Sequence, residues 1–128
     1  MTLLLDTSVL IDVLRARNSR REQLAELAKA GHTVVTTVLN VAELYSGMRQ
    51  EEEGRTEAFL SGLHCLDLTG TAARFAGKLK FDWARKGHTL ALADTIIAAI
   101  ALENRCQLFT DNRRDFPMPE LRFYTPQV

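Results

Sequence analysis

Apolar positions along the chain follow two periods, and the periods change at regular intervals. Residues spaced three and four apart, such as Val9, Leu10 and Val13, predict amphipathic helices. Gly31 and Gly87 stand where two of these helices are expected to end, a position that glycine commonly takes. The spacing predicts helices over residues 7–17, 22–30, 38–49, 51–62, 71–86 and 91–105.

Short runs of apolar and β-branched residues separate the helical stretches and predict strands. The runs are LLL (3–5), HTVVTT (32–37), LHCLDLT (63–69), CQLFT (106–110) and LRFYT (121–125). Strands that alternate with helices indicate a parallel sheet flanked by helices. The expected fold is one α/β domain over residues 1–128, a three-layer α/β/α sandwich around a central, mainly parallel, five-stranded sheet.

Composition limits the classes of function. A chain of 128 residues fits one domain. Its 16 basic and 16 acidic residues balance, so there is no global positive field, and any nucleic-acid contact must use local basic patches. Cys65 and Cys106 lie in apolar runs without CxxC spacing and are expected to be reduced, buried and inert.

No signal peptide or membrane span is visible in the sequence. The N-terminus lacks a basic region, and the apolar runs are far shorter than the ~20 residues that cross a bilayer. The expected location is the cytoplasm, with no membrane partner.

Acidic residues gather at one predicted edge of the sheet. Asp6 follows the first strand, Glu43 lies early in the helix after the second, and Asp94 lies in the first turn of the helix before the fourth. Asp111 and Asp115 follow the fourth strand. Carboxyl ends of parallel strands share one edge, where α/β proteins bind ligands.

Two of these acids also have unusual helical neighbours. Residues three, four and seven positions after Asp94 are apolar, so its carboxylate shares a buried stripe. That placement is costly unless the charge is paired, hydrogen-bonded or bound to a cation. Glu43 shares its face with Asn40 and Gly47, and the glycine is expected to leave room for a ligand.

Clustered carboxylates favour a divalent cation. Oxygen ligands without a Cys or His cluster suit Mg²⁺ or Mn²⁺ better than Zn²⁺. Such a cation lowers the pKa of a bound water and stabilises charge on a scissile phosphate. The pattern therefore indicates a metal-dependent phosphodiesterase, although each acid alone could also be a helix or turn cap.

Four segments, in this order, resemble the motifs of PIN-domain ribonucleases, most closely their VapC-like toxin branch. They are LLLDTSVLID, VAELYSG, LADTIIAAIA and LFTDNRRDF. The resemblance implies an Mg²⁺- or Mn²⁺-dependent endoribonuclease whose catalytic and metal-holding residues are Asp6, Glu43, Asp94 and Asp115. It also implies supporting roles, as orienters of ligands or waters, for Ser8, Thr110 and Asn112.

One position in the fourth motif stays open, since Asp111 could take the place of Asp115 as the fourth acid. Asp12 lies about a turn and a half beyond Asp6 and is expected to be peripheral. The resemblance further implies an RNA substrate, a VapB-like antitoxin that inserts a segment into the pocket, and a homodimer.

Basic residues near the acidic edge are candidates for RNA contact. Arg113 and Arg114 flank the fourth motif and are the best placed. Further candidates are Arg15, Arg17, Arg20, Arg21, Arg49, Arg85 and Lys86. The three histidines lack ligand spacing and receive no catalytic role. The stripe formed by Phe75, Leu79 and Trp83 is expected in the core or, where exposed, in a dimer or antitoxin groove.

Rival classes fit less well. An aspartyl-nucleophile phosphatase needs a second Asp two residues after the first, where Ser8 stands. A response-regulator receiver needs an acidic pair after the first strand and an Asp after the third, and neither is evident. The remaining alternative is a non-catalytic PIN-fold binding module or co-repressor that acts only with its antitoxin.

Overall fold

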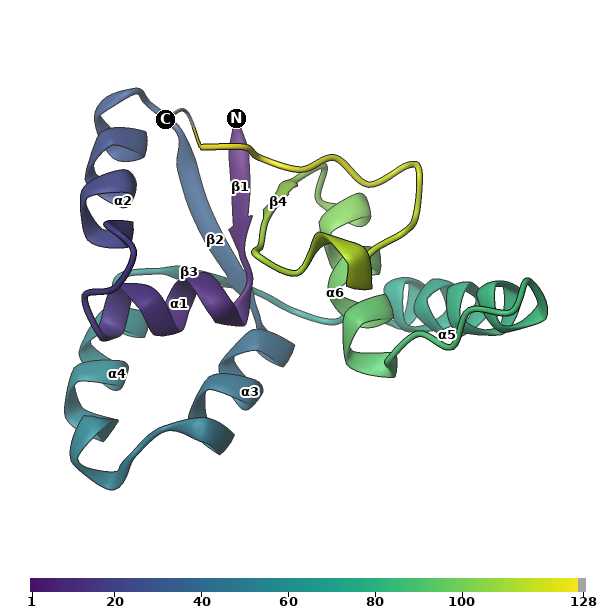
Figure 1. The fold of residues 1–128 in the computed structure, drawn as a ribbon, viewed down its shortest axis with the longest axis horizontal. Helices are drawn as coiled ribbons and strands as arrows, with labels where there is room; N and C mark the ends of the chain where they lie inside the picture. The colour runs from purple at the N-terminus through teal and green to yellow at the C-terminus, as the bar shows by residue number, and fades with distance from the viewer. Residues whose placement is uncertain (127–128) are drawn as a thin grey trace.

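A four-stranded parallel sheet with helices on both faces forms the fold of residues 1–126, which the computed structural model describes (Figure 1). The strands are β1 (Thr2–Leu5), β2 (Thr33–Thr37), β3 (His64–Leu66) and β4 (Gln107–Phe109). The helices are α1 (Thr7–Leu14), α2 (Arg20–Lys29), α3 (Val38–Gly47), α4 (Glu53–Ser61), α5 (Gly70–Arg85) and α6 (Leu92–Glu103), with short 3₁₀ turns η1 (Gln50–Glu52) and η2 (Arg113–Asp115). None of the helices within residues 1–126 has the length and apolar composition needed to span a bilayer.

The leucines of β1 explain the three layers. Leu3 and Leu5 face one side of the sheet and pack in a core with residues of α1, α2 and α4. Leu4 faces the other side and packs with residues of α5 and α6. All three are fully buried, because helices cover both faces of the sheet. Successive side chains of a strand point to opposite faces, and Leu3, Leu4 and Leu5 therefore form an unbroken apolar run. The predicted α/β/α sandwich is confirmed.

Strand order places the residues after β1 and β4 side by side. The order is β3-β2-β1-β4, so the chain leaves β1 in one direction to reach β2 and later returns on the other side as β4. The Asp6 N–H donates to the Phe109 carbonyl at 3.0 Å, which joins the two strand ends. This reversal of strand order is the point where open α/β sheets bind ligands.

The predicted fifth strand is wrong. Residues 121–125 form one isolated parallel bridge, between Leu108 and Phe123, with two backbone hydrogen bonds to Leu108 of 2.8 and 2.9 Å. Prolines at 117, 119 and 126 bracket this segment and lack the N–H that a longer ladder requires.

Local differences also occur at the first helix and at a cysteine. Helix α1 ends at Leu14, three residues early, because Ala16 takes a left-handed conformation (φ 53°) and the Arg17 N–H bonds back to the Asp12 carbonyl. Cys106 is buried as expected, but Cys65 is only half-buried. Burial raises the pKa of both free thiols.

Candidate active site

Asp6 is a positioned anion and not a helix cap. It occupies the N-cap position of α1, yet its carboxylate makes no capping hydrogen bond. One oxygen accepts from Asn40 Nδ2 at 2.9 Å and the other from the Thr110 hydroxyl at 2.6 Å. The residue is only 6% exposed. Donors from α3 and from the end of β4 therefore hold the carboxylate in one orientation.

Asn40 connects Asp6 to Glu43. The Asn40 side chain is fully buried, and its amide donates to Asp6 and also to the Thr7 hydroxyl at 3.0 Å. Its oxygen accepts from the Thr37 hydroxyl at 2.7 Å. The Thr7 hydroxyl in turn donates to Glu43 Oε1 at 2.7 Å. Two predicted acids thus share one directional hydrogen-bond chain.

Neither Asn40 nor Thr7 is predicted from the sequence as a site residue. The available signal is the spacing of Asn40, one turn ahead of Glu43 in the segment VLNVAEL. Ser8, predicted as a supporting residue, instead has its hydroxyl beside the fourth motif, where it accepts from the Asp111 N–H at 3.4 Å. The role of Ser8 stays a prediction.

Asp94 lies within reach of the charges of the other predicted acids. Asp94 lies half-buried in the first turn of α6 and, like Asp6, does not cap its helix. Burial, followed by the negative charges of Asp115, Asp6 and Glu43, raises the pKa of Asp94 from 3.8 to about 6. The four acids come from four separate segments, and three of them are close enough to Asp94 for their charges to act on it.

Asp111 and Asp115 have different surroundings. Asp111 forms an ion pair with Arg20, whose guanidinium also bonds Asp12 at 3.2 Å. Asp115 instead raises the pKa of Asp94 and lines the same cavity as Asp94. A carboxylate already neutralised by an arginine is a poor cation ligand, so this geometry favours Asp115 as the fourth acid.

The donor chemistry of the site suits Mg²⁺ or Mn²⁺. Within residues 1–126, no three Asp, Glu, His or Cys side chains are grouped as a ready-made metal cage. The ion pairs found in that part of the chain leave all four acids unneutralised. Mg²⁺ is often held by one or two carboxylates and keeps several waters, so a closed cage is not required.

Supporting contacts come from the fourth motif. The Thr110 hydroxyl accepts from the Asn112 N–H at 3.0 Å and donates to Asp6, so the turn itself orients this donor. Asn112 acts here through its backbone, while its side chain is exposed.

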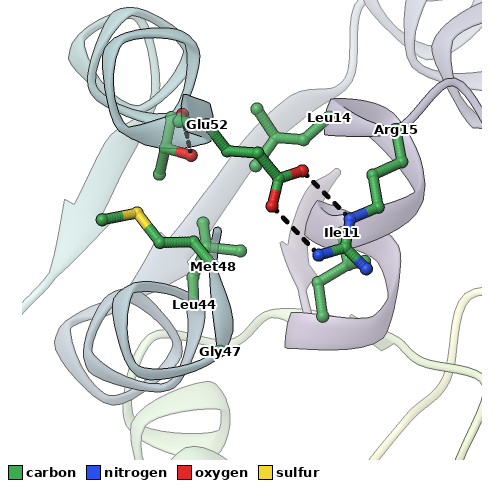
Figure 2. A pocket seen from close by; sticks show the side chains of 8 residues that line it. Ile11, Leu14, Arg15, Leu44, Gly47, Met48 and Glu52 are labelled. Atoms are coloured by element: carbon green, nitrogen blue, oxygen red, sulfur yellow. Dashed lines mark hydrogen bonds and ion pairs between the residues drawn. The ribbon is translucent and has the colours of Figure 1, made fainter. Parts of the chain in front are cut away.

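Two arginines considered for RNA contact are instead part of the fold. Arg20 is 7% exposed and paired as described above. Arg15 bonds both oxygens of Glu52 at 3.0 and 3.1 Å across a small, largely apolar cleft between α1 and α3, as Figure 2 shows. Hydrogen bonds from this guanidinium and then from the Arg49 N–H lower the pKa of Glu52 to about 2. Gly47 lines the same cleft, so the space it leaves does not belong to the cavity beside Asp94.

The two arginines of the fourth motif have different surroundings. Arg113 donates to the Thr125 hydroxyl at 2.6 Å and to the Tyr124 carbonyl at 3.2 Å, which ties it to the C-terminal segment. Arg114 is exposed and lines the cavity that contains Asp94 and Asp115. Of the two, Arg114 is the better placed for a ligand at the acidic centre.

The fold and the candidate site define a class of protein, an α/β domain with carboxylates near the reversal of its strand order. The family model for the PIN domain matches residues 3–120, and the chain belongs to the PIN-domain family. Within the family its relatives are VapC proteins. Ribonuclease VapC19 of Mycobacterium tuberculosis is 33% identical over 120 residues, which cover 93% of this chain and 96% of that one.

Further comparisons agree with this placement. Ribonuclease VapC10 of Mycobacterium tuberculosis is 34% identical over 118 residues, which cover 92% of this chain and 88% of that one. Among solved structures, VapBC2 from Rickettsia felis bound to a DNA fragment from their promoter matches with a TM-score of 0.85 at 24% identity, over 97% of this chain and 98% of that one. The structural likeness supports the fold, and the VapC relatives support the predicted branch.

Proposed function

We propose that this protein is an Mg²⁺- or Mn²⁺-dependent endoribonuclease, the toxin of a VapBC-type pair, acting in the cytoplasm. Its relatives VapC19 and VapC10 are ribonucleases by name. The observation that carries the proposal is geometric: Asn40 and Thr7 join the carboxylates of Asp6 and Glu43 in one hydrogen-bond chain. The charges of Asp6, Glu43 and Asp115 also reach the half-buried Asp94 and, after burial, raise its pKa. Placing like charges close together costs free energy, and a role in phosphodiester hydrolysis would explain why the protein keeps such a site.

Asp6, Glu43, Asp94 and Asp115 would hold the cation. When bound, the cation lowers the pKa of a water and offsets charge on the scissile phosphate. Asn40 and Thr110 fix the carboxylate of Asp6 from both sides, so little rearrangement of that side chain is needed on binding. A bound cation would favour the ionised form of Asp94 and so lower its pKa again.

Binding of Mn²⁺ should weaken in acid. Asp94, with a pKa of about 6, must lose its proton to bind a cation, so affinity should fall about tenfold from pH 7.5 to pH 5. Isothermal titration with Mn²⁺ at both pH values measures the change. The Asp94→Asn variant is the control and should bind weakly, with little dependence on pH. Equal affinity of the unmodified protein at both pH values would contradict the assignment of Asp94 as a ligand.

A cleavage assay tests the function itself. Total RNA is incubated with the purified chain, with Mn²⁺ or with a chelator, and the new RNA ends are sequenced. Metal-dependent ends at a defined site are expected. RNA that remains intact with Mn²⁺ would favour the non-catalytic co-repressor, a role suggested by two VapBC complexes solved with DNA, one of them with a promoter fragment.

The expected protein partner is a VapB-like antitoxin, since the solved relatives are VapBC complexes. Homodimerisation stays a prediction. The α5 stripe expected in the core or an interface divides: Leu79 is buried, Trp83 is partly buried, and Phe75 is 42% exposed. Phe75 and the 61% exposed Phe81 are therefore available to a partner surface.

A further inference from the structure

The cavity beside Asp94 and Asp115 extends beyond the acids. Its volume is about 430 Å³, within the range of roughly 300–1,000 Å³ typical of ligand sites. The described residues that line it are His88, Thr89, Leu90, Ala91, Asp94, Arg114 and Asp115. Most of the wall is thus not carboxylate, and the proposed cation chemistry leaves it without a role.

The wall formed by residues 88–91 is held in place. Gly87 reverses the chain with φ +90°, a conformation that glycine adopts without strain. The segment then runs back along α5 to the start of α6 (Figure 1). The Lys80 ammonium donates to the Leu90 carbonyl, and the Leu90 side chain is 7% exposed. A wall anchored in this way presents a preformed surface to a ligand.

His88 places an aromatic ring on that wall. The side chain is exposed, and its ring meets Trp83 edge to face, with centroids 5.5 Å apart and planes at 85°. The two rings are therefore not stacked on each other. Lys86 Nζ lies 4.6 Å from the Trp83 ring centroid and adds a positive charge nearby. Aromatic rings beside cations are the recurring features of sites for single-stranded nucleic acid.

Arg114 supplies the guanidinium of the cavity. Within residues 1–126, no hydrogen bond or ion pair engages its side chain, in contrast to Arg113, which is bound to Thr125. An arginine whose guanidinium is not already paired can bind a phosphate through two parallel hydrogen bonds.

We propose that this cavity is the subsite for one unpaired nucleotide of the RNA, next to the scissile phosphate. Arg114 contacts the backbone phosphate and His88 stacks against the base. The nucleotide is unpaired because a base in a duplex cannot present its face to a side chain. This inference rests on the proposed ribonuclease function and names where the substrate lies relative to the acids.

Binding of a short, single-stranded, fluorescein-labelled RNA of mixed sequence tests the subsite. Fluorescence anisotropy is measured across salt concentrations in the Asp6→Asn background, which prevents cleavage. Adding Arg114→Gln should weaken binding and reduce the slope of log Kd against log salt by about 0.7, the loss expected for one phosphate contact on a single strand. Adding His88→Ala should raise Kd about tenfold, as the loss of one stacked base does, with the slope unchanged.

Matched variants distinguish the loss of an RNA contact from a loss of folding. Arg122→Gln and His64→Ala change the same residue types at exposed positions outside the cavity lining and should leave Kd within about twofold. His88→Phe keeps a planar ring and should restore binding lost in His88→Ala. All variants should keep the parental melting temperature.

The results can contradict the proposed subsite without contradicting the proposed ribonuclease function. If Arg114→Gln and His88→Ala both bind RNA like their parent while the unmodified protein cleaves RNA, the subsite is overturned and the ribonuclease stands. Weaker binding by Arg114→Gln with an unchanged salt slope would also overturn the phosphate contact. No cleavage by the unmodified protein in Mn²⁺ would overturn the proposed function, and the subsite with it.

Discussion

Replacing Asp94 with asparagine is expected to abolish RNA cleavage and, at neutral pH, to relieve a destabilising charge. Loss of a cation ligand removes several kcal/mol of transition-state stabilisation, which lowers the cleavage rate about 10³-fold. Single-turnover cleavage of a defined RNA measures this loss. Asp6→Asn should have a similar effect on the rate, because Asp6 is the most firmly held of the four acids.

The stability effect has the opposite sign and follows from the pKa. The folded-state pKa of Asp94, about 6, exceeds its ordinary value of 3.8, so the native state binds the proton more tightly than the unfolded chain. The parent therefore loses stability as pH rises from about 4 through 6, and the asparagine variant does not. The unfolding free energy of Asp94→Asn, relative to that of the parent, should rise by about 1 kcal/mol from pH 4 to pH 7.5. This value allows for solvent screening of a half-buried group.

An exposed carboxylate provides the control. Asp67→Asn lies outside the site and should change neither the cleavage rate nor the pH dependence of stability by a measurable amount. Full cleavage activity in Asp94→Asn, or an unfolding free energy that follows pH as in the parent, would remove Asp94 from the proposed centre. Urea titrations at several pH values supply the second measurement.

Replacing Arg20 with methionine is expected to destabilise the fold by about 3 kcal/mol, the loss typical when one partner of a buried ion pair is removed. The Arg20 guanidinium bonds Asp12 at 3.2 Å, pairs with Asp111, and lies 4.9 Å from the Phe109 ring centroid. It joins α1, α2 and the segment after β4. Methionine keeps the apolar contact but leaves Asp12 charged and nearly buried, with Asn18 as its remaining side-chain donor at 2.9 Å.

A second substitution identifies the cause. Adding Asp12→Asn to Arg20→Met removes the stranded charge and should recover at least about 1 kcal/mol. Arg17→Met, at an exposed arginine of the loop before α2, should stay within about 0.5 kcal/mol of the parent. Unfolding in urea measures all three variants. If Arg17→Met and Arg20→Met cost the same, the buried network does not stabilise the fold.

The sequence by itself determined the class of fold and named the acids proposed for the site. Alternating periods of two and 3.6 residues are local properties, so β1, the helices and the strand ends could be assigned from neighbouring residues alone. Asp6 and Asp115 could then be assigned to one sheet edge, because every parallel strand ends there. The same local signal failed at residues 121–125, where the apolar pattern was right but prolines limited pairing to one bridge.

Only the tertiary structure decided which of these groups meet. Asp6 is held by Asn40, 34 positions away, and by Thr110, 104 positions away, and Arg20 neutralises Asp111 across 91 positions. Such pairs depend on β4 lying beside β1, an outcome of global packing that no local period encodes. The physical reason is that periodicity reports which face of an element is buried, whereas the partner of a buried polar group is set by the strand order.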